Sequence, residues 1–166
     1  MKKGKGVIAA AFVLYAALLI WLVMFKLELD PANLCSYRQL ILIPFSRPGA
    51  LNMRTVVWEI VLNVLAFVPL GLCLSALEIP KRAWQRILLG LGVSLVFEIL
   101  QYVFAIGASD VTDLINNTVG TALGVLLWLP VKKLLKEKAA LVTGIVLLSL
   151  QLAAVFGYLL LSLANV

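Results

Sequence analysis

Four carboxylic acids stand in or beside the most apolar stretches of this chain, and these residues could do chemistry. A carboxylate serves as a general acid or base. Its oxygens also bind a divalent cation or the amine of a ligand. Asparagine and glutamine side chains accompany the acids in the same stretches. Together they form a predicted functional polar cluster of Glu59, Asn63, Glu98, Gln101, Asp110, Asp113 and Asn117.

The spacing of the last members of this cluster is helical. Asp110, Asp113 and Asn117, followed by Thr121 and Gly124, lie three or four residues apart. On a helix they form one polar, small-residue stripe. Inside a bilayer such a stripe must face protein or water rather than lipid. A simpler interpretation makes Asp110 the N-cap of the helix, with Asp113 stabilised by the helix dipole.

The other polar groups also have structural interpretations. Amide and hydroxyl side chains in membrane helices often serve as interhelical hydrogen-bond partners. That interpretation applies to Asn63, Ser94, Gln101 and Asn117. Glu98 differs, because it lies between Phe97 and Ile99 in the middle of an apolar run, far from any helix end, so capping cannot explain it. We therefore interpret Glu98 as functional.

The composition places these residues in a membrane protein. Of the 166 residues, 63% are hydrophobic and 13% charged, with a mean hydropathy of +1.08. Soluble domains are about 45–50% apolar and about 25% charged. We predict one all-α membrane domain, residues 1–166, with the lipid bilayer as its partner and no nucleic acid, metal or cofactor. The absence of histidine excludes His-based triads.

Apolar runs of about 20 residues are long enough to cross a bilayer as helices. The sequence contains five of them, separated by short polar segments except for one longer loop at residues 26–55. A cleaved signal peptide is the alternative for the first run, which is longer than usual for that role. The predicted spans are residues 7–25, 56–77, 87–106, 111–130 and 139–163. The apolar run 40–45 is too short to cross, and would lie in the interface or fold back over the helices.

Basic residues predict the orientation of the bundle, because cytoplasmic loops are enriched in Lys and Arg. Five spans place ten basic residues on one side and four on the other. The N-terminus is therefore predicted inside and the C-terminus outside. The richer side carries Lys2, Lys3, Lys5, Lys81, Arg82, Arg86, Lys132, Lys133, Lys136 and Lys138, and the poorer side Lys26, Arg38, Arg47 and Arg54.

With this orientation, the whole predicted polar cluster falls in the outer half of the membrane. Four carboxylates in one leaflet cannot all be charged and unpaired. Arg38, Arg47 and Arg54 of the outer loop are the available cations within the chain. A metal ion or a ligand amine is the external alternative.

Three motifs in order carry a family resemblance: Asn63-x-x-x-Phe67-x-Pro69-x-Gly71, then Glu98-x-x-Gln101, then Asp110-x-x-Asp113-x-x-x-Asn117-Thr118-x-Gly120. Together with Ile43-Pro44-Phe45, they make the chain resemble the VanZ-like family over roughly residues 10–130. The resemblance implies a small multi-pass protein of the bacterial cell membrane, associated with resistance to the lipoglycopeptide teicoplanin. Where many relatives carry an Arg before the first Asp, this chain reads Gly107-Ala108-Ser109.

Three functions fit these features. The first is a binding or protective protein, whose outer-leaflet polar pocket takes an amphiphilic ligand, either a lipoglycopeptide or a cell-wall lipid. The second is an enzyme on a lipid-linked substrate, with Glu98 or Asp113 as acid or base. The third is a small proton-coupled carrier that uses Glu98. We favour the first, since no nucleophile motif supports an enzyme and five spans leave little room for transporter repeats.

Overall fold

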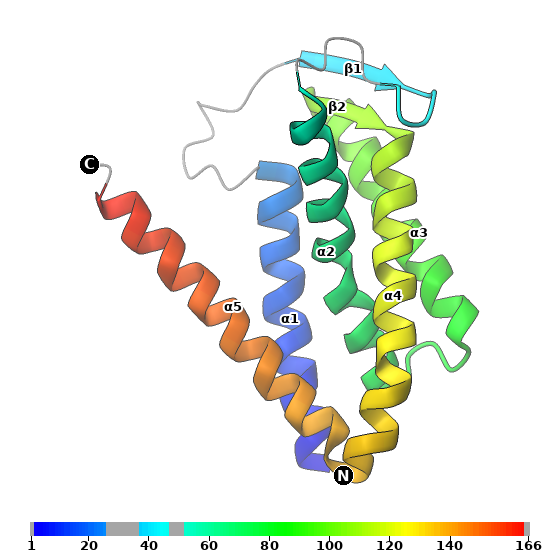
Figure 1. The fold of residues 1–166 in the computed structure, drawn as a ribbon, viewed down its shortest axis with the longest axis vertical. Coiled ribbons are helices and arrows are strands. Elements are labelled where there is room, and N and C mark those ends of the chain that lie inside the picture. Colours follow the sequence, from blue (N-terminus) through cyan, green and yellow to red (C-terminus); the bar gives the residue numbers. More distant parts are fainter. Residues whose placement is uncertain (1, 26–36, 47–51, 165–166) are drawn as a thin grey trace.

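The computed structural model describes residues 2–25, 37–46 and 52–164. Long helices form an up-and-down bundle, and a small sheet lies across one end of it (Figure 1). The elements in chain order are α1 (Lys2–Phe25), β1 (Tyr37–Ile41), α2 (Met53–Leu77), α3 (Ala83–Phe104), β2 (Ile106–Asp110), α4 (Val111–Leu135), the short 3-10 helix η2 (Lys136–Lys138) and α5 (Ala139–Ala164).

Four helical stretches of the described chain are long and apolar enough to cross a membrane. They are Gly4–Met24, Met53–Leu77, Ala83–Phe104 and Val111–Ser162. The last is 52 residues long and comprises α4, η2 and α5. In Figure 1 the chain turns back between α4 and α5, at the end of the bundle opposite the sheet. Lys136 has a positive φ of 49° at this turn, where the helical hydrogen-bond ladder is interrupted.

Two C-terminal helix ends differ from the predicted ones by more than one residue. Helix α3 ends at Phe104 rather than Ile106, because Ala105 adopts the left-handed conformation and the chain then enters β2. Helix α4 continues past Pro130, its predicted end, as far as Leu135. A proline inside a helix removes one backbone N–H. Membrane helices tolerate that loss where neighbouring groups satisfy the freed carbonyl.

The centre of the bundle is the pair α2 and α4, whose contact is the most extensive between any two of the described elements. Glycines allow their backbones to approach closely. A Cβ on Gly124 would lie 2.9 Å from the Cα of Gly71 and from the backbone N of Leu72. A Cβ on Gly120 would lie 3.0 Å from the Cβ of Phe67. Gly120 and Gly124 therefore allow the close packing of α4 against α2.

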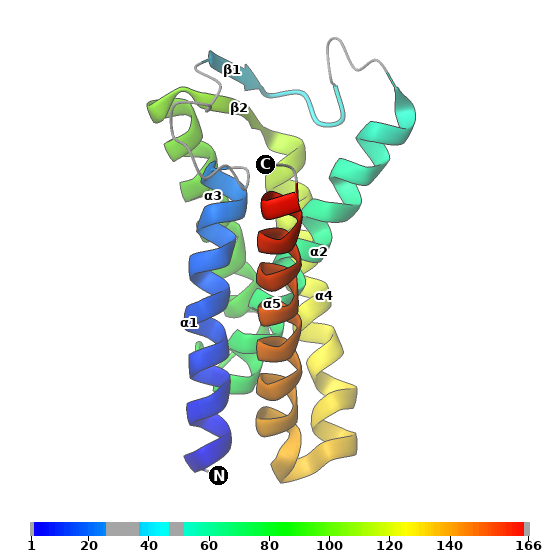
Figure 2. The same cartoon turned by 90° about the vertical axis from the view of Figure 1, so that its left-hand side faces the viewer.

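Helices α1 and α5 form a second pair. They pack together where Gly144 meets the backbone of Ile8, and their far ends are joined by an edge-to-face contact of Trp21 with Tyr158 at 4.9 Å. Figure 2 shows α5 beside α1, and Figure 1 shows its C-terminal half leaning away from α2 and α4. The predicted polar cluster therefore has to be built mainly by α2, α3 and α4.

The all-α prediction is correct for the bundle and misses the sheet. Strands β1 and β2 pair in parallel, with Tyr37 opposite Ile106 and Ile41 opposite Asp110. The missed strand β1 lies within the predicted loop 26–55, of which residues 26–36 and 47–51, with Cys35 and Arg47, lie outside the described residues. The run 40–45 does not continue as a helix. Its first residues complete β1, which lies across the ends of the helices (Figure 1).

Candidate functional site

A cavity of about 670 Å³ opens beneath β1, at the sheet end of the bundle. Its size is within the range of roughly 300–1,000 Å³ that is usual for small-molecule sites. All seven residues of the predicted polar cluster line it, so the structure brings the whole set together. Four elements contribute these residues: α2 carries Glu59 and Asn63, α3 carries Glu98 and Gln101, β2 ends at Asp110, and α4 carries Asp113 and Asn117.

The floor of the cavity is aromatic. Phe67 lines it and is fully buried, and its ring meets that of Phe97 edge to face, with centroids 6.4 Å apart. Tyr15 packs in the same apolar cluster and donates a hydrogen bond of 2.7 Å from its hydroxyl to the carbonyl of Ala66. The polar lining therefore ends at a closed hydrophobic layer across α1, α2 and α3.

Glu98 ties α3 to the segment that follows it. One oxygen of its carboxylate accepts the backbone N–H of Asp110 at 2.9 Å. Its main-chain carbonyl accepts the hydroxyl of Ser109 at 2.6 Å. The sequence analysis excluded any capping role for Glu98, which is correct only for its own helix. The structure shows that it satisfies a backbone donor just before α4, on a different element, so this acid also has a structural role.

Asp110 and Asp113 have separate partners. Asp110 is the N-cap of α4, and its side chain accepts the backbone N–H of Thr112 at 2.7 Å, which confirms the capping interpretation. Asp113 lies in the first turn of α4, and its Oδ1 accepts a hydrogen bond of 2.7 Å from the side-chain amide of Asn63. That bond joins α2 to α4 within the cavity wall.

The remaining amides also connect elements, as the interhelical interpretation predicted. Asn117 donates from Nδ2 to the hydroxyl of Ser94 at 2.9 Å, joining α4 to α3. Gln101 donates from Nε2 to the carbonyl of Val23 at 3.0 Å, joining α3 to α1. Hydrogen bonds of six of the seven residues thus connect the elements around the cavity: Asn63, Glu98, Gln101, Asp110, Asp113 and Asn117.

The roof of the cavity comes from residues that the sequence analysis did not single out. Tyr37, Gln39 and Ile41 of β1 line the polar cavity. Leu40 and the following Leu42 line a separate cavity. Successive strand side chains point to opposite faces. Apolar and polar residues do not alternate along Tyr37–Ile41, so no strand signal in the sequence could have found these lining residues.

The separate cavity is smaller, about 240 Å³, and lies on the other side of Glu98 and Asp110. These two acids line both cavities. Apart from them and Ser109, the lining of the smaller cavity is aliphatic and aromatic: Leu40, Leu42, Leu95, Ile99, Tyr102, Val111 and Leu114.

Arg38, one of the cations predicted to compensate the acids, binds elsewhere. Arg38 donates from Nη2 to the carbonyl of Val103 at 3.0 Å, and its guanidinium lies 6.0 Å from the centre of the Tyr102 ring. Within the described residues, neither Arg38 nor Arg54 forms an ion pair with the acids of the cavity. Arg47 lies outside the described residues. Among the residues that the structure describes, no group of three or more acids or thiols is placed so as to hold a metal ion.

The motifs that line this cavity fall within one family model. Residues 12–136, which include every member of the polar cluster, match the VanZ/LLP1 family. The chain belongs to the VanZ/LLP1 family. It is 43% identical over 132 residues to "Protein VanZ" of Enterococcus faecium, a match that covers 75% of each chain. No solved structure matches this family member. The resemblance predicted from the three motifs is therefore confirmed.

Proposed function

We propose that this VanZ/LLP1 protein crosses the bacterial cell membrane five times and binds an amphiphilic ligand in the polar cavity at its outer leaflet. The ligand is a teicoplanin-type lipoglycopeptide or a cell-wall lipid, and binding contributes to glycopeptide resistance or envelope protection. The observation that carries the proposal is the convergence of all seven predicted polar residues on one cavity. A purely structural set of helix contacts would have no need to enclose such a volume.

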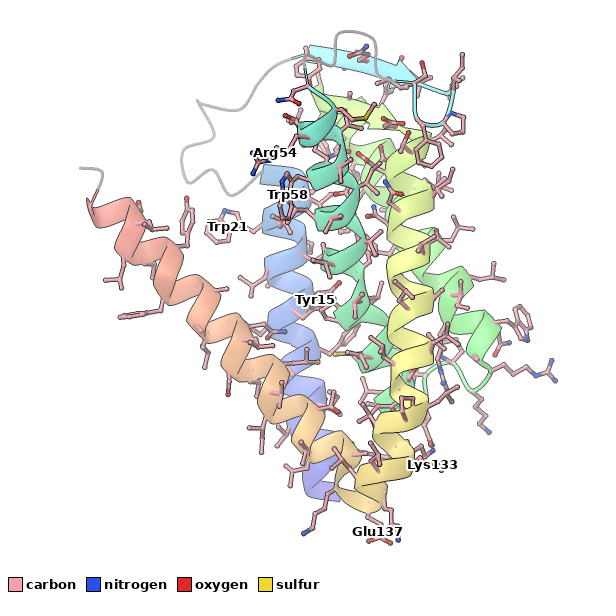
Figure 3. The ribbon with its side chains drawn as sticks, viewed as in Figure 1. Tyr15, Trp21, Arg54, Trp58, Lys133 and Glu137 are labelled. Carbon is pink, nitrogen blue, oxygen red and sulfur yellow. The ribbon has the colours of Figure 1, made fainter. Side chains whose placement is uncertain are left out.

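The charge distribution supports the orientation. Lys133 and Glu137 lie at the end of the bundle opposite Arg54 and Trp58 (Figure 3). The basic segments after α2 and α4 therefore share the end that holds the N-terminus (Figure 1). Enrichment of Lys and Arg marks the cytoplasmic side. With that end inside, β1 and the cavity face outward, where lipoglycopeptides and cell-wall lipids meet the membrane.

Family membership supports the resistance role. The similar Enterococcus faecium chain is a VanZ protein. The region that matches the family model, residues 12–136, contains every residue that lines the cavity. A lipidated antibiotic inserts its chain into the outer leaflet and keeps its polar part at the surface. A cavity of about 670 Å³ would accommodate one polar group of such a molecule, rather than a whole glycopeptide.

The test is drug susceptibility with the cavity blocked. Thr55 lies in the first turns of α2 and lines the cavity, whereas Val57, two residues on, is exposed and does not line it. Thr55→Trp would fill the mouth, and Val57→Trp is the matched control. In cells with equal membrane levels of each protein, we expect protection against teicoplanin with wild type and Val57→Trp but not with Thr55→Trp.

Vancomycin, which lacks the long lipid tail, serves as the second drug. The proposal requires the protection to be larger for teicoplanin than for vancomycin. Equal susceptibility of cells with and without the wild-type protein would show that the resistance role does not apply to this chain. Equal protection by Thr55→Trp and Val57→Trp would show that the cavity is not the working site.

A further inference from the structure

The amide side chains around the cavity are arranged with a consistent polarity. Asn63 and Asn117 donate their side-chain N–H groups to Asp113 and Ser94, and Gln101 donates to the carbonyl of Val23. Each of the three side-chain amides thus donates one N–H group to an acceptor of the protein. A side-chain amide offers two N–H donors and one carbonyl oxygen with two lone pairs. The amide groups that remain available to a ligand therefore include more acceptor sites than donors.

Asn117 shows the consequence most clearly. It is only 3% exposed, and it lines the cavity. Its Oδ1 is buried and has no hydrogen-bond partner within the described part of the chain. Buried acceptors are nearly always hydrogen-bonded, and each exception requires an explanation. A ligand that donates a hydrogen bond to this oxygen would explain why the oxygen has no partner in the protein.

The opposite orientation of the Asn117 amide would not remove the problem. It would turn Oδ1 toward the Ser94 hydroxyl, which can donate, and would bury an unpartnered N–H group in place of the oxygen. The ligand would then have to accept rather than donate. The two orientations therefore require ligands of opposite hydrogen-bonding character, which an experiment can distinguish.

Charge favours a donor. Among the described residues that line the cavity, the acidic and basic side chains are all Asp and Glu, without Lys or Arg. Arg38, the cation of β1, lies between Tyr37 and Gln39 in sequence, but its guanidinium binds the carbonyl of Val103. Glu98 uses one carboxylate oxygen for the N–H of Asp110, and a carboxylate has about four lone-pair sites. It therefore retains capacity to accept from a ligand.

From these contacts we infer that the cavity selects the primary ammonium group of an amphiphile, with Asn117 Oδ1 and the Glu98 carboxylate as its acceptors. This inference rests on the proposed function and names the headgroup chemistry.

Binding of single-chain probes to the purified full-length protein tests this inference. The probes share a dodecyl chain and differ in headgroup: a primary ammonium, a trimethylammonium that has the charge but no N–H, and a phosphate. Native mass spectrometry from a neutral detergent would measure the bound fraction of each probe. We expect the primary ammonium to bind at least about tenfold more tightly than either other probe, which is about 1.4 kcal/mol.

Variants then assign the acceptors. Asn117→Leu and Glu98→Gln should each weaken binding of the primary ammonium about tenfold. Asn117→Asp keeps an acceptor oxygen of the same shape and should retain binding, which guards against a Leu variant that fails to fold. Asn116→Leu is the matched control, because Asn116 is buried on the same turn of α4 but does not line the cavity.

Each other outcome overturns the inference. Preference for the phosphate would mean that the cavity presents donors, as in the opposite amide orientation. Equal binding of all three probes, unchanged in Asn117→Leu, would leave an amphiphile site without ammonium selectivity. Failure of every probe to bind wild type would also refute it, while the Thr55→Trp susceptibility test judges the proposed function separately. If the ammonium binds, competition by phosphatidylethanolamine or by teicoplanin would identify which source of amine displaces it.

Discussion

A close backbone contact between α2 and α4, beside the cavity, provides a quantitative test of how packing supports the site. Gly120 lies on α4 one turn beyond Asn117, against α2. In Gly120→Ala the new Cβ would lie 3.0 Å from the Cβ of Phe67, and it would overlap the carbonyl oxygen of Val64 more deeply. Ordinary contact begins at 3.4 Å, so α2 and α4 must separate by at least about 0.4 Å.

Separation of α2 from α4 would also affect the hydrogen bonds between polar residues that line the cavity. The Asn63–Asp113 hydrogen bond between the same two helices is 2.7 Å long. A rigid shift of about 0.4 Å would lengthen it to about 3.1 Å, near the upper end of the usual N–H···O range of about 2.7–3.2 Å. Relief of the Val64 overlap requires more, so we expect this bond to break.

The expected cost combines two effects. Overpacking typically costs about 1–3 kcal/mol, and the higher helix propensity of alanine offsets up to about 1 kcal/mol of it. Loss of the hydrogen bond adds about 0.5–1.5 kcal/mol. For a chain of this length, a net 1–3 kcal/mol corresponds to a fall in Tm of roughly 3–10 °C.

Thermal unfolding in detergent, followed by tryptophan fluorescence, measures this change. Gly92→Ala is the matched control, because a Cβ on this α3 glycine would meet nothing within 4 Å. We expect its Tm to be unchanged or slightly raised. A Gly120→Ala protein that unfolds within about 1 °C of wild type would refute the packing argument. If it is destabilised but protects cells fully, the link from packing to the site would be wrong.

Two further predictions concern single contacts. Tyr15→Phe removes the buried hydrogen bond to the Ala66 carbonyl, and should lower the free energy of unfolding by about 1 kcal/mol; an unchanged value in detergent unfolding would mean that another donor replaces the hydroxyl. Glu78→Gln should cost less than about 0.5 kcal/mol, because the 2.8 Å ion pair with Lys132 is exposed. The hydrogen bond to Lys132 lowers the pKa of Glu78, so this stabilisation is present above the ordinary pKa of 4.5 and is lost as pH falls through the lowered value. The difference between wild type and Glu78→Gln should therefore vanish in acid, and a difference that grows there would contradict the assignment.

The helices and the N-cap of α4 could be predicted from the sequence because each depends on interactions between residues close together in the chain. The length of each apolar run predicted a helix of about the observed extent, since hydrogen bonds within a helix satisfy its own backbone. Asp110 was predicted as an N-cap because capping depends on residues only two or three positions away. The predicted end of α4 at residue 130 was wrong, because the helix continues through Pro130 to Leu135. Membrane helices tolerate an internal proline where neighbouring groups satisfy the freed carbonyl.

The sheet was not predictable in the same way. Tyr37–Ile41 and Ile106–Asp110 are more than sixty residues apart, and neither has the long apolar alternation of an independent strand. Each strand satisfies the other's backbone, so neither segment specifies the pairing alone. The position of Arg38 follows from the same arrangement, because it depends on where β1 lies relative to the end of α3.

The sequence by itself determined that the chain is a helical membrane protein with its acids and amides near one end of three apolar helices. It also carried the motifs of the VanZ/LLP1 family. Only the tertiary structure decided that those residues enclose one cavity, that Glu98 satisfies the backbone of Asp110, and that the Oδ1 of Asn117 is buried without a protein partner in the described chain. The physical reason is that apolar length and helical spacing are properties of one segment, whereas enclosure and hydrogen-bond pairing depend on the relative position of several segments.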